Sequence, residues 1–168
     1  MNKRLAAIIV SMALFSFIAV FLIRSFNRLD LWQIYLPAIA SFSSPRAVDL
    51  NQDGILNIII GAGGDEFMGC DSAIIAFDGL NGDLLWHTPG RDQMVGSALF
   101  THINRDEVPD IVLSGRAGQL MAVSGRDGSL IWSFFSEEDF GAAPDSVFLN
   151  FYASHLLPDL DHDGKPDL

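Results

Sequence analysis

Oxygen-bearing side chains occur at regular intervals in a short segment of the chain. Positions 1, 3, 5 and 9 of residues 49–57 are Asp49, Asn51, Asp53 and Asn57. A tight loop can turn such positions toward one centre, and Gly54 at position 6 allows the sharp bend. The backbone carbonyl of Ile55 at position 7 can add another oxygen. Because Ca²⁺ takes roughly six to eight hard oxygen ligands from flexible loops, the sequence predicts a calcium-binding loop here.

Two further segments repeat this pattern. The third copy, residues 159–167, is the most acidic, and Lys165 in it supplies only a carbonyl; its carboxylates are Asp159, Asp161, Asp163 and Asp167. The second copy, residues 102–110, is degenerate, because His102 stands at position 1 and Glu107 replaces the glycine; it retains Asn104, Asp106 and Asp110. We expect Ca²⁺ in the first and third loops and weaker binding in the second. The alternative is that these side chains cap the turns without a metal.

The nine-residue pattern also overlaps the loop of the EF-hand, a helix–loop–helix calcium site. An EF-hand requires Glu at position 12 and flanking helices. Position 12 of the first loop is Ile60, which lies in an apolar run typical of a strand. The sequence therefore excludes an EF-hand and predicts that the acidic loops connect β-strands.

A second signature alternates with the acidic loops. Residues 76–86 read AFDGLNGDLLW and residues 122–132 read AVSGRDGSLIW, while a partial copy, LDLW, ends at Trp32. The acidic loops themselves start at positions 49, 102 and 159. Both spacings are close to the repeats of about 40–50 residues that are typical of the blades of a β-propeller. Two signatures that recur in the same order therefore predict a repeat architecture of this kind.

The strand pattern predicts an all-β fold. Short apolar or β-branched runs, separated by Gly, Asp and Asn, lie at residues 55–60, 72–77, 83–86, 111–114, 119–123 and 129–134. Gly82 and Gly128 supply turns that need a positive φ, and each Trp packs in the wedge between blades. We expect four-stranded antiparallel blades, two complete and a third begun. The sequence then corresponds to the N-terminal piece of a longer protein, because repeats bury their faces only against neighbours.

The N-terminal segment predicts a membrane anchor. Residues 5–23 contain no charged side chain, and a helix of this length spans roughly 28 Å. We interpret them as a single-pass transmembrane signal anchor, with residues 1–4 cytoplasmic, residues 24–44 a linker with a candidate closing strand, and residues 45–168 the repeats. The repeats would then lie on the extracytoplasmic side, at the cell surface or in a periplasm. A cleaved signal peptide, which would give a secreted protein, stays open as the alternative.

The acidic loops resemble the FG-GAP (VCBS) repeats of the integrin α-chain propeller, and the Trp strands resemble those of pyrroloquinoline-quinone-type propellers. Together the resemblances cover about residues 29–168. They imply a seven- or eight-bladed propeller with structural Ca²⁺, whose partners bind another face. The resemblance assigns as ligands Asp49, Asn51, Asp53, Ile55 and Asn57 in the first loop, and Asp159, Asp161, Asp163, Lys165 and Asp167 in the third.

Composition restricts the function. The chain has 168 residues and a net charge of −11, and residues 31–168 hold six Lys/Arg against 20 Asp/Glu, which disfavours nucleic acid as a partner. Cys70 is the only cysteine, so an intrachain disulfide is excluded. No arrangement of residues suggests catalysis or a bound organic cofactor. The sequence favours a binding or adhesion module for a protein or carbohydrate ligand, with a quinoprotein-like dehydrogenase or sensor domain as the alternative.

Overall fold

The computed structural model describes residues 12, 14–18, 31–135 and 149–168, and the chain divides into two units, Met1–Leu31 and Trp32–Leu168. In the first unit, residues 14–18 are helical and their apolar side chains are exposed. Within the part of the chain that the structure describes, no helix has the length and apolar character of a membrane span. The predicted anchor at residues 5–23 lies mostly outside the described residues, as do residues 1–4.

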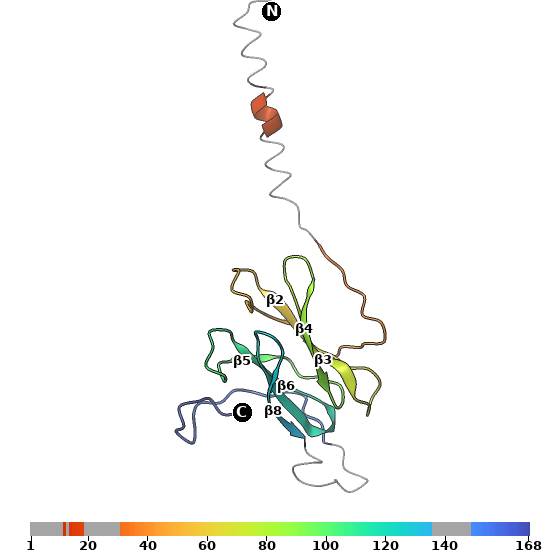
Figure 1. Cartoon of the computed structure of the whole chain (residues 1–168), viewed down its shortest axis with the longest axis vertical. Helices are drawn as coiled ribbons and strands as arrows, with labels where there is room; N and C mark the ends of the chain where they lie inside the picture. The colour runs from red at the N-terminus through yellow and green to blue at the C-terminus, as the bar shows by residue number, and fades with distance from the viewer. Residues whose placement is uncertain (1–11, 13, 19–30, 136–148) are drawn as a thin grey trace, which may run out of the picture. The chain divides into compact units, whose positions relative to one another are not determined.

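The second unit contains two four-stranded antiparallel sheets, each with its strands in chain order (Figure 1). The first sheet consists of β1 (Arg46–Val48), β2 (Asn57–Gly61), β3 (Cys70–Phe77) and β4 (Leu84–Gly90). The second sheet consists of β5 (Leu99–Thr101), β6 (Asp110–Ser114), β7 (Gln119–Val123) and β8 (Leu130–Phe135). All six predicted strand ranges overlap an observed strand. The all-β class is therefore confirmed, and the described residues form two sheets that do not close into a ring.

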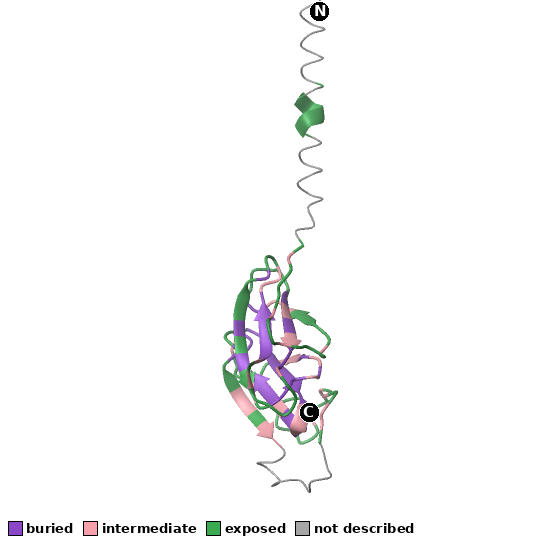
Figure 2. Cartoon of the chain, turned by 90° about the vertical axis from the view of Figure 1, so that its right-hand side faces the viewer, coloured by how far each residue is buried: buried purple, intermediate pink, exposed green. Residues whose placement is uncertain are grey.

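Burial separates the inner strands from the outer ones (Figure 2). Every residue of β6 is buried, and β3 is buried from Ala73 to Phe77. The edge strands β4 and β8 are mostly exposed or half-buried, and β1 and β5 at the opposite edges contain no buried residue. Runs of Ile, Val and Leu therefore form strands that are covered on both faces, whereas the strands with mixed composition form the edges.

The two outer hairpins have the same turn. Asp78 N–H donates to the Asp83 carbonyl at 2.8 Å, and Ser124 N–H donates to the Ser129 carbonyl at 2.8 Å. In the pairs Asn81–Gly82 and Asp127–Gly128 only the glycine adopts a positive φ, +80° at Gly82 and +73° at Gly128. Next to each turn, the pairing of the two strands shifts in register, which accommodates the length of the turn. The turns thus require glycine as predicted.

The sheets are joined by tryptophan. The indole N–H of Trp86, on β4, donates to the carbonyl of Gly125 at 3.0 Å, across to the second sheet. The indole N–H of Trp32 makes the equivalent bond to Gly79 of the first sheet, also at 3.0 Å. A core cluster that contains Trp86 draws buried residues from both sheets. The predicted packing between blades is therefore confirmed for Trp86, whereas Trp32 packs against buried residues of the first sheet.

The predicted linker shows little regular structure in its described part. Residues 31–36 form no strand, and Ala40 makes a single antiparallel bridge to Gly63. Pro37 lacks the N–H that a continuous ladder would need. The predicted closing strand is thus absent from residues 31–36, but Trp32 still occupies the position that Trp86 occupies one sheet later.

Candidate metal centre

Each acidic loop is closed by the side chain at its position 9. The N–H at position 2 donates to this side chain in all three loops: Leu50 to Asn57 at 2.7 Å, Ile103 to Asp110 at 2.6 Å, and Leu160 to Asp167 at 2.6 Å. Position 9 also pairs across the loop with the strand that precedes it, as Val48 pairs with Asn57 and Thr101 with Asp110. The side chain at position 9 therefore holds the loop closed, whether or not a metal binds.

Two backbone positions in the loops are left-handed. At position 4, φ is +60° for Gln52, +66° for Arg105 and +64° for His162. At position 6, φ is +85° for Gly54 and +86° for Gly164, and a Cβ at either glycine would meet nothing within 4 Å. Backbone conformation, and not space, thus selects glycine at position 6. The second loop has Glu107 there, without a positive φ, so its path differs from that of the other two.

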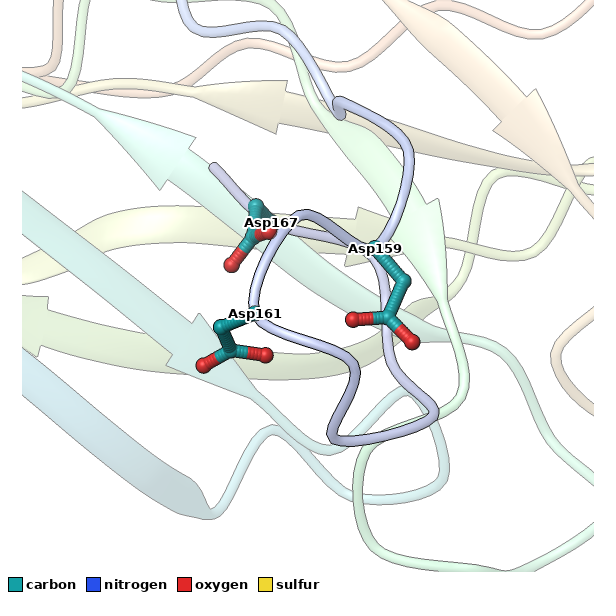
Figure 3. A group of neighbouring side chains, drawn as sticks. All are labelled: Asp159, Asp161 and Asp167. Atoms are coloured by element: carbon teal, nitrogen blue, oxygen red, sulfur yellow. The ribbon is translucent and has the colours of Figure 1, made fainter.

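The third loop brings three of its predicted ligands together. The carboxylates of Asp159, Asp161 and Asp167 each offer an oxygen within 4.8 Å of the others. Figure 3 shows the three side chains on this one loop, with Asp159 and Asp167 at its two ends. The carboxylate of Asp163 lies outside the cluster and accepts the N–H of Lys165 at 2.8 Å. Lys165 itself is exposed.

The donor set of the third loop fits a hard divalent cation. Carboxylates a few ångströms apart repel one another by about 1 kcal/mol per pair in bulk water, too little to prevent the loop from forming. A Ca²⁺ ion would convert this repulsion into attraction, and the exposed loop leaves room for water ligands. Both oxygens of Asp159 accept backbone N–H groups, from Asp163 at 3.1 Å and Gly164 at 2.9 Å, which orients the carboxylate before an ion arrives.

The first loop has the same frame with fewer charges. Asp49 accepts the N–H groups of Gln52 at 2.7 Å and Gly54 at 3.0 Å, and the bond from the position-6 glycine is the one that Asp159 also accepts. The amide of Asn51 donates to Asp53 at 3.0 Å, so a cation here requires Asn51 to present its oxygen instead. Asn57 is fully buried and Ile55 is exposed. The first loop therefore offers two carboxylates near the surface.

The second loop contains a cation from the protein itself. The guanidinium of Arg126 donates to Asp106 at 3.1 Å. Desolvation raises the pKa of Asp106, but the Val108 N–H and Arg126 outweigh it and hold this pKa below its usual value of 3.8. Asp110 is fully buried, and its Oδ1 has no hydrogen-bond partner among the described residues. Sequence reasoning missed Arg126, because it lies in the outer hairpin, two strands further along the chain than Asp106.

The chain is similar in sequence to part of a longer known protein. No family model matches the sequence, and no solved structure matches it. The chain is 28% identical over 153 residues to Protein FAM234A of Bos taurus, an alignment that covers 82% of this chain. It covers 27% of the relative, so the chain spans about a quarter of the length of the curated protein that it resembles.

Proposed function

We propose that this chain is part of a membrane-anchored, extracytoplasmic β-propeller module whose acidic loops are braced by structural calcium, and that the module binds a protein or carbohydrate ligand. The observation that carries the proposal is the convergence of Asp159, Asp161 and Asp167 in the third loop. The same loop frame in the first repeat supports it, because a frame that recurs argues for one shared role. In this role the ion stiffens the loop and takes no part in a reaction.

The propeller is supported by the way in which the repeats join. Two four-stranded sheets follow one another in the chain, and each receives a tryptophan from the segment before it. Such joints repeat head to tail, which is how the blades of a propeller stack around an axis. The proposed anchor at residues 5–23 would hold the module at a membrane surface, and the acidic composition agrees with a partner other than nucleic acid.

Calcium binding is tested by thermal unfolding of the full chain in detergent micelles, followed by tryptophan fluorescence with EDTA or Ca²⁺. A ligand at about 100 times its Kd stabilises the folded state by about 2.7 kcal/mol, which raises Tm by about 5–10 °C for a domain of this size. We expect this shift in the parent chain. Asp161→Asn should remove most of the shift, because it withdraws one of the three charges.

The matched control is Asp71→Asn, which removes the same charge from an exposed position outside the loops. This variant should keep the full calcium shift. The proposal is wrong if Ca²⁺ leaves the Tm of the parent chain unchanged, or if Asp161→Asn and Asp71→Asn respond alike.

The quinoprotein alternative is supported by the Trp strands, whose contacts with glycine turns recur in both sheets. It makes a different prediction, namely that the protein with added pyrroloquinoline quinone reduces a redox dye in the presence of an alcohol or sugar. We expect no dye reduction above that of the free quinone. Turnover that depends on the protein would favour the enzyme over the binding module.

A further inference from the structure

Three contacts hold the Gly125 turn at the joint between the two sheets. The indole of Trp86 donates to the Gly125 carbonyl. A Cβ built on Gly125 would collide with the carbonyl of Pro109, at position 8 of the second acidic loop, and would lie 2.9 Å from Leu50, at position 2 of the first. The turn is thus held by the Trp, by position 2 of the loop before it, and by position 8 of its own loop.

The joint one repeat earlier follows the same rule. Gly79 accepts the indole N–H of Trp32, and a Cβ on Gly79 would collide with the carbonyl of Leu56, which is position 8 of the first loop. The second glycine of each turn lies on the indole ring, since a Cβ on Gly82 or Gly128 would come within 2.6 Å of the facing tryptophan. Both glycines of a Gly-x-x-Gly turn are therefore selected by close contact.

The residues of the second sheet and third loop that would make the same contacts line a pocket. The repeat counterparts of Trp86, Leu50 and Pro109 are Trp132, Ile103 and Pro166. All three line a pocket of about 190 Å³. Trp132 is only half-buried, and its indole N–H has no hydrogen-bond acceptor among the described residues. The pocket therefore corresponds to the space that the Gly125–Gly128 turn fills in the joint before it.

We propose that the Trp132 pocket binds a Gly-x-x-Gly hairpin turn from a third repeat, contributed by polypeptide downstream of the third acidic loop. The indole N–H of Trp132 donates to the carbonyl of its first glycine, and its second glycine lies on the ring. Within the described residues, the Gly79–Gly82 and Gly125–Gly128 turns of the outer hairpins are already held by Trp32 and Trp86. Each of them follows its own acidic loop after two further strands, so the same order places a third turn two strands beyond Asp167.

The proposal is tested by supplying the turn. A flexible Gly/Ser linker of about 12 residues, with a root-mean-square length of roughly 20 Å, joins Leu168 to a copy of residues 119–135. The copy carries Phe in place of its tryptophan, so that it adds no indole signal. Such a tether raises the effective concentration of the hairpin to the millimolar range. The full chain is studied in EDTA, so that the outcome does not depend on calcium and is separate from the calcium test.

The readout is the indole N–H resonance of Trp132, assigned by loss of its signal in Trp132→Phe. We expect this resonance to shift downfield and its hydrogen exchange to slow by about tenfold, which corresponds to about 1.4 kcal/mol of closure. The matched control is the same tail with both turn glycines changed to Val, whose Cβ atoms collide with the Pro166 carbonyl and the indole. This tail should leave Trp132 as it is in the chain without a tail.

Three results would overturn the proposal. The first is a Trp132 resonance that does not respond to the glycine tail, and the second is an equal response to the valine tail. The third is a shift of Trp132 in the chain without a tail that grows with protein concentration, because the occupant of the pocket would then be a second copy. Neither tail alters residues 1–168, so the Trp132 pocket has the same sequence in both variants.

Discussion

Arg126 distinguishes the second acidic loop from the first at the level of single residues. Residue 80 has the same place in the first hairpin that residue 126 has in the second, and it is leucine. The first hairpin consequently offers no guanidinium to Asp53, whereas the second offers one to Asp106. The second loop, which has neither the glycine nor an acidic residue at its first position, is the one that contains this internal cation.

The Asp106–Arg126 pair gives a testable pH dependence. The pKa of Asp106 is lowered in the folded state, so its carboxylate adds stability above about pH 3.8, and this is lost as the pH falls through the lowered pKa. Arg126→Leu should raise the pKa of Asp106 in an NMR titration of its side-chain carboxyl. The control Arg46→Leu removes a charge from the exposed strand β1 and should leave this pKa unchanged. An Asp106 pKa that is the same in both variants would contradict the assignment.

At the level of elements, the longer strands and their turns were largely predictable from the sequence, but the three-residue strands were not. The apolar runs of β2, β3, β6 and β7 predict strands by themselves, and Gly82 and Gly128 mark the turns that follow β3 and β7. β1 and β5 have only three residues each, too few for a periodic pattern. The carboxylate cluster was predicted as a set of four, and Asp163 lies outside it. Its carboxylate accepts the N–H two residues later, an Asx-turn bond that Asp53 and Asp106 also make at the same position of their loops.

The close approach at Gly79 gives a prediction at this level. Gly79→Ala places a Cβ against the Leu56 carbonyl, which forces the hairpin away from the acidic loop. Overpacking of this kind costs about 1–3 kcal/mol in the free energy of unfolding, measured by urea denaturation. Gly64→Ala is the control, because its Cβ would meet only the Ala38 carbonyl at 3.8 Å. We expect that variant to lie within about 0.5 kcal/mol of the parent chain, and equal costs would refute the close approach.

At the scale of the whole second unit, Trp86 couples the two sheets. It is 8% exposed and belongs to the core cluster that both sheets share. Trp86→Ala should cost about 3–5 kcal/mol and leave the Gly125 carbonyl without its donor. We expect the first and second sheets to unfold in separate steps, which native-state hydrogen exchange of β3 and β7 amides would detect.

Tyr35→Ala is the control for this prediction, since Tyr35 is an aromatic residue that is 85% exposed. It should leave a single transition at the denaturant midpoint of the parent chain. If the amides of β3 and β7 still exchange at one common free energy in Trp86→Ala, the sheets are coupled by contacts other than the tryptophan.

The direction of the tryptophan contact has a consequence for how such molecules grow. Each sheet offers an indole on one flank and accepts one on the other, so the two surfaces of a joint are different and cannot be satisfied by a symmetric pair. Assembly from such directional joints proceeds head to tail, and it closes into a ring only if the accumulated rotation returns the last unit to the first. The rotation at each joint then decides between a ring and an open array, and duplication of a gene segment can lengthen the array without a new interface.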